Sequence, residues 1–305
     1  MMDKQKIRLA HSPDPDDAFM FYGLATGAVS SGPFEFEHIL RDIQTLNDWA
    51  LEGKLEVTAV SVHAYAYLHD QYAILSSGAS MGATDLAVYI PPDSSPGVSV
   101  ADASSDEPTR AQGPLLIARE PIDLTELKGK TIAVPGTRTS AFLGLQLALG
   151  PFDYEVTMFD RIPQAVQNGN VDAGLIIHEG QLTYGQLGLH CLLDLGRWWF
   201  QKTNLPLPLG CNIIRRDLGD ETMQQISAIL KSSIEYSLSN REPAVSYALQ
   251  FGRDLNHDQA SEFVGMYVND WTLDYGPAGR RAVKEFLAQG RQANLAPEIE
   301  RFDFV

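Results

Sequence analysis

Through the first two thirds of the chain, short runs rich in β-branched residues alternate with stretches of helical periodicity. Short apolar strands separated by helices are typical of βα units. The pattern therefore predicts an α/β fold with largely parallel sheets. The predicted strands are Ile7–Ser12, Phe34–Leu40, Val57–Val62, Tyr72–Ser77, Gly113–Arg119, Thr131–Pro135, Tyr154–Phe159, Ala173–His178 and Cys191–Leu195, and the predicted helices are Asp17–Thr26, Thr45–Gly53, Ser140–Leu149 and Ile162–Asn168.

The last third of the chain changes character, because apolar residues recur there at helical spacing. Two amphipathic helices are predicted, and each is expected to cover a sheet formed by earlier residues. Their apolar positions are Met223, Ile226, Leu230, Ile234 and Leu238 in the first helix, and Ala278, Ala282, Val283, Phe286 and Leu287 in the second.

One segment breaks the alternation. Residues 91–108 are poor in large apolar side chains and rich in serine, proline, glycine and aspartate. A segment of this composition cannot bury enough apolar surface to join a core, so we expect a surface excursion. A tolerated insertion is favoured over a lid.

Charge restricts the partners of the chain. The formal net charge of -16 gives a field that repels phosphate backbones and anionic lipid surfaces. No run of lysine and arginine offsets this field, so neither nucleic acid nor a membrane is an expected partner. A small anionic ligand must then be bound by local donors, such as helix N-termini or single arginines.

Targeting and redox signals are sparse. The N-terminal stretch lacks the apolar run of a signal peptide, and no later segment is apolar enough to span a membrane. We therefore expect a cytoplasmic protein. Cys191 and Cys211 are too few for a disulfide framework or a cysteine-based zinc site, and two buried reduced thiols are the favoured interpretation.

The stretch HSPDPDDAFMFY at residues 11–22 places three carboxylates between prolines and aromatic residues. The carboxylates could hold a metal ion, catalyse a reaction or start a helix. A site for a hard cation needs oxygens from separated positions in a defined loop, whereas aspartates in a first helical turn complement the helix dipole. A helix start is the favoured interpretation, and no metal is expected.

Polar residues follow three predicted strands, at the edge where ligands lie in open α/β sheets. Thr139 and Ser140 follow Val134–Gly136 at a predicted helix start, where they could cap the helix, receive a carboxylate, or do both. His178 ends an apolar strand and could be a structural residue or a general base kept neutral by burial. Ser61 ends a third strand and could donate to a ligand.

Motifs for several familiar cofactors do not occur in the sequence. The phosphate loop GxxxxGK[ST], a GxGxxG after a strand, and the nucleophile motif GxSxG are all missing. His178 and Glu179 do not form the HExxH zinc motif, because Leu182 stands where its second histidine belongs. Neither a nucleotide cofactor nor a zinc hydrolase is supported.

Taken in order, these stretches resemble the 1,4-dihydroxy-6-naphthoate synthases of the futalosine route to menaquinone. The opening HSPDPDDAFMFYGLATG is similar to the family's SPCPND-T-F-x-FYAL, and DIQTLNDWALEG is similar to its D-x-x-TLN-x-WALEG. Further matches are Gly113–Leu115, Val134–Gly136, Gly174–Glu179, Leu205–Gly210 and Arg216–Gly219.

The resemblance implies the fold of type II periplasmic binding proteins, in which two α/β lobes with mixed or parallel sheets enclose a ligand cleft. Residues 1–112 would form the first part of lobe 1, with an insert at about residues 83–112. Residues 113–209 would form lobe 2. Residues 210–305 would complete lobe 1 with the C-terminal helices, after Leu207–Arg215 leads back to it.

The resemblance also implies an activity. The family converts cyclic dehypoxanthine futalosine to 1,4-dihydroxy-6-naphthoate by carbon–carbon cleavage, with no cofactor. His178 would be the base that abstracts a proton, and the substrate would contact Thr139, Ser140 and the segment Ala59–Val60–Ser61. The expected partner is thus a small-molecule carboxylate.

Departures from the family pattern bear on that substrate. Ala59 stands where the family commonly has a lysine, which removes a cation that could meet the substrate carboxylate. Asp14 and Asp16 stand where cysteine and asparagine are usual. We expect Arg138 and backbone amides to hold the carboxylate, or the substrate to differ, with Asp16 taking part in recognition.

Two alternatives stay open. The chain could be a two-lobed solute-binding protein for a small carboxylate, or a paralogous enzyme of the pathway that acts on a different carboxylated substrate. The oligomeric state is not predicted.

Overall fold

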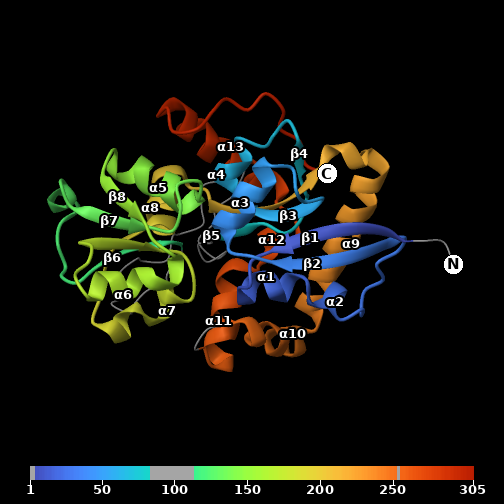
Figure 1. The fold of residues 1–305 in the computed structure, drawn as a ribbon, viewed down its shortest axis with the longest axis horizontal. Helices are drawn as coiled ribbons and strands as arrows, with labels where there is room; N and C mark the ends of the chain where they lie inside the picture. Colours follow the sequence, from blue (N-terminus) through green and yellow to red (C-terminus); the bar gives the residue numbers. More distant parts are fainter. Residues whose placement is uncertain (1–3, 83–112, 253–254) are drawn as a thin grey trace, which may run out of the picture.

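The computed structural model describes residues 4–82, 113–252 and 255–305. Within these residues the chain forms two lobes side by side, each built around its own sheet (Figure 1). The predicted α/β class with two lobes is confirmed. The predicted insert at residues 83–112, with the excursion at residues 91–108, lies outside the described residues.

Lobe 1 contains the sheet with strand order β2-β1-β3-β11-β4, and β5 also pairs with β11. The first three strands run parallel, whereas β11 is antiparallel to β3, β4 and β5. The sheet is therefore mixed. Its strands are β1 (Gln5–His11), β2 (Phe34–Leu40), β3 (Val57–Ser61), β4 (Tyr72–Ile74), β5 (Ser80–Gly82) and β11 (Leu207–Arg215).

Lobe 2 contains the sheet with strand order β10-β6-β9-β7-β8. β7 is parallel to β8 and β9, and β6 is antiparallel to β9 and β10. Every strand predicted from the alternating pattern is present, with ends shifted by a few residues, while the short β5 was not predicted. The strands of lobe 2 are β6 (Leu115–Ala118), β7 (Thr131–Val134), β8 (Asp153–Val156), β9 (Ala173–Ile176) and β10 (His190–Asp194).

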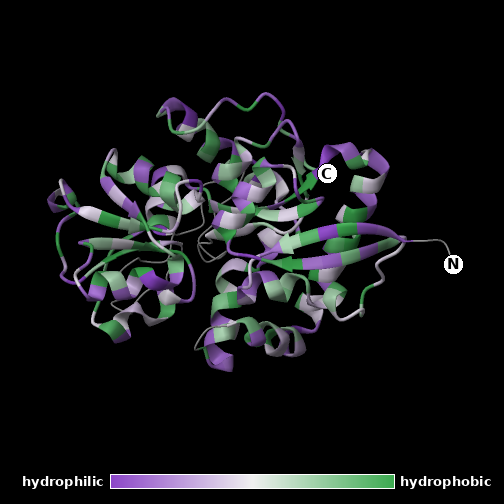
Figure 2. Ribbon diagram, viewed as in Figure 1, coloured by the Kyte–Doolittle hydropathy of each residue, from purple (hydrophilic) through white to green (hydrophobic). Residues whose placement is uncertain are grey.

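Helices cover both sheets, and none in the described part of the chain is both long and apolar enough to cross a membrane. Figure 2 shows hydrophobic residues along the central strands and mixed faces on the surrounding helices. The α-helices are α1 (Pro15–Met20), α2 (Tyr22–Ala25), α3 (Ile43–Leu51), α4 (Val62–Tyr65), α5 (Ser140–Leu149), α6 (Ile162–Gln167), α7 (Gly180–Thr183), α8 (Leu195–Thr203), α9 (Asp220–Ser239), α10 (Arg241–Ala248), α11 (His257–Tyr267), α12 (Asp270–Leu273) and α13 (Gly276–Gln292).

The single helix predicted over Asp17–Thr26 is wrong, because the chain breaks at Phe21 into α1 and α2. The hydroxyl of Ser233, on α9, occupies the break: it donates to the carbonyl of Met20 and accepts from the amide of Leu24, both at 3.0 Å. A buried side chain thus replaces backbone hydrogen bonds that a continuous helix would make.

The two late amphipathic helices are present and cover lobe 1. α9 buries Met223, Ile226, Leu230 and Ile234 in one cluster with residues of α1, α2 and the first sheet. α13 packs against β11 and also against α5 of lobe 2. Its Phe286 meets Trp199 of α8 edge to face, with ring centroids 5.3 Å apart. α13 therefore joins the two lobes through a hydrophobic seam.

Gly82 and Gly113, which flank residues 83–112, lie against the return strand at one place. Gly82 is the register partner of Leu207, the first residue of β11. A Cβ on Gly113 would lie 3.5 Å from the side chain of the same leucine and 2.6 Å from the amide nitrogen of Gly196. The chain therefore leaves lobe 1, enters lobe 2 and returns to lobe 1 at adjacent points.

The two cysteines differ in exposure. Cys211 is buried in β11, as expected, but Cys191 is exposed. The prediction of two buried thiols is wrong for Cys191 because β10, which carries it, is an edge strand of the lobe 2 sheet.

Candidate active site

A cavity of about 700 Å³, including space open to solvent, lies between the lobes and is lined by residues of both. Small-molecule sites occur preferentially at such interfaces between domains. Most of the candidate site residues from the sequence lie in its wall. These are Asp16, Ala59, Val60, Ser61, Thr139, Ser140 and His178.

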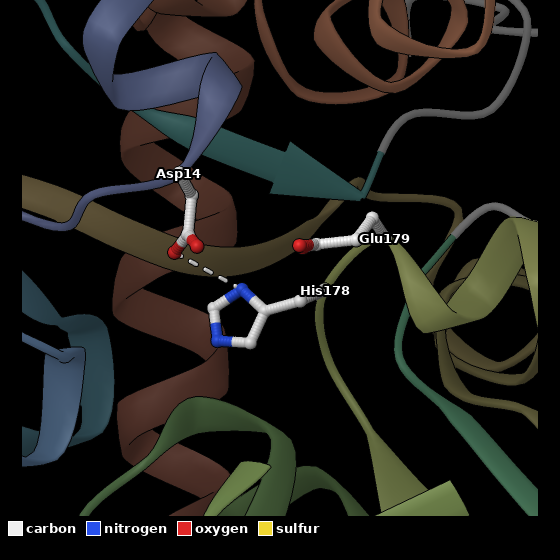
Figure 3. Close-up of side chains that lie close together, drawn as sticks. All are labelled: Asp14, His178 and Glu179. Carbon is white, nitrogen blue, oxygen red and sulfur yellow. Dashed lines mark ion pairs between the residues drawn. The ribbon is translucent and has the colours of Figure 1, made fainter. Parts of the chain in front are cut away.

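His178 lies just beyond the end of β9 and reaches across the cavity to the other lobe. Its Nδ1 lies 3.1 Å from Oδ2 of Asp14, and 13% of its side chain is exposed. Figure 3 shows that Nε2 points away from this carboxylate. Among the described residues, Nε2 has no hydrogen-bond partner. The ring of Phe159 contacts the imidazole edge to face, with centroids 4.1 Å apart.

Asp14 comes from the acidic stretch that opens the chain. It is the N-cap residue of α1, with Pro15 at the first helical position, but its side chain does not cap the helix. The interpretation as a helix start is correct for the backbone. The side chain of Asp14 instead crosses the cleft to His178, a role that no local sequence signal indicated.

The pKa of His178 is raised above its ordinary value of 6.5. Burial is the largest single influence and lowers the pKa, but the charge and hydrogen bond of Asp14, with Glu179 and Asp16, outweigh it. The expectation that burial keeps His178 neutral is therefore wrong in direction. Once deprotonated, such an imidazole is a stronger base than a free one.

Two aspartates of α1, Asp16 and Asp17, also line the cavity, and the pKa of each is raised. Burial, followed by repulsion from Asp17 and Asp14, raises the pKa of Asp16 well above 3.8. Burial likewise raises the pKa of Asp17 to about 6, although its Oδ2 accepts a hydrogen bond from the Ser12 amide at 2.8 Å. Asp16 in its protonated form can donate a hydrogen bond into the cavity.

Asp14, His178 and Glu179 are residue types that bind divalent metal ions, and one atom from each lies within 4.8 Å of the others. In Figure 3 the carboxylate of Glu179 faces that of Asp14, while Nδ1 of His178 faces Asp14 directly. The distance of 3.1 Å is that of a hydrogen bond. The sequence-based expectation of a site without metal stays a prediction.

Ser61 is held in the cavity wall by Asn47 of α3, which is fully buried. The Asn47 carboxamide accepts from the Ser61 amide at 2.9 Å and donates to its hydroxyl oxygen at 3.1 Å. Because the hydroxyl oxygen accepts from Asn47, its own proton remains available to a ligand. Ser61 was a predicted contact residue because it ends a strand, whereas Asn47 was not predicted, although it lies in the TLN motif of the family resemblance.

The hydroxyls of Thr139 and Ser140 are engaged within the protein. Thr139 caps α5 by accepting from the Phe142 amide at 3.2 Å, and it donates to the Gly136 carbonyl at 2.8 Å. Ser140 donates to the carbonyl of Leu209 at 2.6 Å and accepts from the His63 amide at 3.1 Å, so it ties the lobes together. The first-turn N–H groups of α5 have no acceptor within the helix.

Arg138 is placed differently from the other candidates. Its guanidinium lies 4.8 Å from the ring centroid of Tyr67, and Arg138 is not among the residues that line the cavity. Ala59 and Val60, by contrast, form an apolar part of the wall. The geometry therefore brings six of the seven predicted contact residues, but not Arg138, to the same cavity as His178.

A second contact across the cleft was also missed. The hydroxyl of Tyr267, on α11, donates to Oε1 of Gln181, on α7, at 2.6 Å. Tyr267 lines the cavity, and both residues are buried. Partners so far apart in the chain carry no local spacing signal, so only the fold could reveal them.

Two α/β lobes with mixed sheets and a cavity between them define a protein of the periplasmic-binding-protein fold. The alkanesulfonate-binding protein of Xanthomonas axonopodis has this fold, with a TM-score of 0.66 at 10% identity, over 98% of this chain and 96% of that one. The aliphatic sulphonate-binding protein of Escherichia coli aligns with a TM-score of 0.59 at 12% identity, over 96% and 89%. The histidine paired with a carboxylate gives this cleft a group suited to acid–base chemistry.

This chain belongs to the menaquinone biosynthesis family, whose profile matches residues 7–85 and 102–292. A relative from Thermus thermophilus, named 1,4-dihydroxy-6-naphthoate synthase, is 38% identical over 99% of this chain and 100% of its own length. A relative of the same name from Streptomyces coelicolor is 31% identical, over 98% and 97%. A protein of Archaeoglobus fulgidus aligns with a TM-score of 0.82 at 42% identity, over 95% and 98%.

Proposed function

We propose that this protein is a 1,4-dihydroxy-6-naphthoate synthase that cleaves cyclic dehypoxanthine futalosine without a cofactor, with His178 as general base. One observation carries the proposal: in the cavity between the lobes, Asp14 engages Nδ1 of His178, and Nε2 has no partner among the described residues. The names of the two relatives support the product, dihydroxynaphthoate. We place the reaction in the cytoplasm.

Asp14 sets the protonation of the base. A carboxylate beside Nδ1 favours the tautomer that carries its proton there, so the lone pair is on Nε2. Nε2 then takes a proton from a hydroxyl of the sugar-derived part of the substrate. The oxygen forms a carbonyl, the adjacent carbon–carbon bond breaks, and its electron pair passes to the ring system that becomes the naphthoate. Aromatisation drives this retro-aldol step forward.

The remaining candidates would hold the substrate around this base. Ser61 donates its free hydroxyl proton, and the first-turn amides of α5, at Ser140 and Ala141, receive a carboxylate. Ala59 and Val60 contact the apolar ring system. Asp16, when protonated, donates a further hydrogen bond. The proposal assigns no contact to Arg138, since it lies outside the cavity wall.

The test is direct turnover. Purified protein incubated with cyclic dehypoxanthine futalosine should release dihydroxynaphthoate, measured by chromatography and mass spectrometry. Replacing His178 by alanine should lower kcat by roughly 10²–10⁴-fold, the usual contribution of a positioned base, with an unchanged circular dichroism spectrum. A wild-type protein that binds the substrate but releases no product would contradict the enzyme proposal.

That last outcome would favour the solute-binding alternative. Its supporting observation is the shared fold with sulfonate-binding proteins. A paralogous enzyme for another carboxylated substrate is the remaining alternative, and the altered residues Ala59 and Asp16 in the cavity wall motivate it. Binding of naphthoates without binding of cyclic dehypoxanthine futalosine would support the paralogue.

A further inference from the structure

Asn212 is a buried amide with an unsatisfied acceptor in the wall of the same cavity. It lies near the middle of β11, between Cys211 and Ile213, and is 2% exposed. Its Nδ2 donates to the Gly78 carbonyl at 3.4 Å, a long hydrogen bond, while Oδ1 has no partner among the described residues. Buried acceptors without partners are uncommon in native proteins, because water or a ligand normally supplies the donor.

The backbone of Gly78 fixes the direction of this amide. Gly78 has a φ of +85°, and a Cβ there would lie 2.1 Å from Nδ2 of Asn212. A side chain at position 78 would displace the amide from this place, and the positive φ disfavours any residue other than glycine. The Gly78 amide is held in turn by the carbonyl of Thr272 at 2.6 Å. The acceptor is therefore preorganised.

The neighbouring strand places a small side chain beside this buried acceptor. Asn212 and Ala59 are direct partners in the antiparallel ladder of β11 and β3, so their side chains lie on the same face of the sheet, with Cβ atoms roughly 5 Å apart. Both residues and Gly78 line the cavity. Ala59 has only a methyl group, so β3 presents no polar side chain to the amide at this register position.

We propose that Oδ1 of Asn212 accepts a hydrogen bond from a hydroxyl of the bound ligand, and that Asn212 is thus a specificity-determining residue. This inference rests on the proposed function and adds to it the group of the ligand that Asn212 recognises. The hydroxyl is one of the two that distinguish dihydroxynaphthoate from plain naphthoate. A site built to pair with a hydroxyl discriminates against the analogue that lacks it, because the buried acceptor is then left unpaired.

Calorimetry on the full chain tests this inference under anaerobic, reducing conditions. The probes are 1,4-dihydroxy-6-naphthoate and 2-naphthoate, the same carboxylate without hydroxyls. The wild type should bind the dihydroxy compound roughly tenfold more tightly, the scale of one neutral hydrogen bond. Asn212→Leu, of similar size but without an acceptor, should bind both with nearly equal affinity. Exposed Asn170→Leu, in lobe 2, should keep the wild-type ratio.

A second variant keeps the test decisive if Asn212→Leu does not fold. Ala59→Leu covers the amide without altering it, and it should also abolish the preference for the dihydroxy compound. Persistence of the tenfold ratio in the folded variants would overturn the inference while the proposed function stands. Equal binding of both probes by the wild type would overturn it as well. If the wild type binds neither probe and releases no product from cyclic dehypoxanthine futalosine, the proposed function is wrong, and the inference about Asn212 is wrong with it.

Discussion

At the scale of single residues, the pair formed by His178 and Asp14 governs the pH dependence of the proposed reaction. The base must be deprotonated to act, and its pKa is raised above 6.5. A histidine with a raised pKa stabilises the folded state below the unfolded value, and this stabilisation is lost as the pH rises through the folded value. The pair therefore contributes least to stability where the base is active.

We expect the acid limb of the kcat/KM profile to have its midpoint above pH 6.5. Asp14→Asn removes the charge that raises the pKa, so the midpoint should move to lower pH, and kcat should fall roughly a hundredfold because Nδ1 loses its partner. Rate measurements between about pH 5 and pH 9 check this, with exposed Asp153→Asn as control. An acid limb at the same pH in both variants would contradict the role of Asp14.

Asp16 gives a second residue-scale prediction, about stability. Its folded pKa is raised, so ionisation destabilises the folded state, and stability is lost as the pH rises from the unfolded value near 3.8 towards the folded one. Asp16→Asn removes this loss. The gain in Tm over the wild type should be small at pH 4 and should increase with pH, as measured by differential scanning calorimetry. A gain that is the same at every pH would argue against a buried, reluctantly ionised carboxyl.

At the scale of elements, α3 positions the end of β3 through one residue. Asn47 makes both of its hydrogen bonds to Ser61. Asn47→Ala should lower the free energy of unfolding by about 1–3 kcal/mol, because the buried Ser61 amide loses its acceptor, and should raise KM. Asn47→Asp retains an acceptor for that amide and should lose less stability. Urea unfolding and steady-state kinetics provide the two measurements.

Elements were predictable from the sequence where local pattern decides. The strands β1 to β4 and β6 to β10, with α5, α9 and α13, follow from apolar periodicity and turn signals alone, whereas β5 was not predicted and the return strand β11 came only from the family resemblance. The break at Phe21 was not predictable, because the residue that stabilises it, Ser233, is remote in sequence. The residues of the site divide in the same way, into those that a local pattern indicates and those that only the tertiary fold brings together. His178 and Ser61 end strands and could be recognised locally, whereas Asp14, Asn47 and Asn212 act through partners that only the tertiary fold brings near.

At the scale of the whole molecule, the two sides of the lobe interface differ in chemistry. On one side, α13 packs Phe286 against Trp199 of lobe 2 in a buried hydrophobic seam. Around the cavity, the contacts are polar: Asp14 with His178, and Tyr267 with Gln181. Packed seams resist separation more than single hydrogen bonds do. The lobes should therefore pivot at α13 and open at the cavity.

Removing the Asp14–His178 and Tyr267–Gln181 contacts together should populate the open form. We expect ligand-free Asp14→Asn/Tyr267→Phe to have a larger radius of gyration than the wild type by small-angle X-ray scattering. Saturating naphthoate should reduce the difference. Tyr154→Phe, on an exposed strand, is the matched control and should leave the scattering unchanged. Identical curves for the double variant and the wild type would contradict a role of these two contacts in closing the cleft.

The closeness of Gly82 and Gly113 at Leu207 means that the segment between them can be exchanged for other sequences. Gly82 and Gly113 both lie against this leucine, so the fold itself holds these two flanking residues close together. Changing the length of a chain between fixed ends costs little, about 0.6 kcal/mol for each doubling. A short glycine–serine bridge or an entire reporter domain should therefore be accepted there with both sheets intact. Such a reporter would sit where the lobes join and would report their motion.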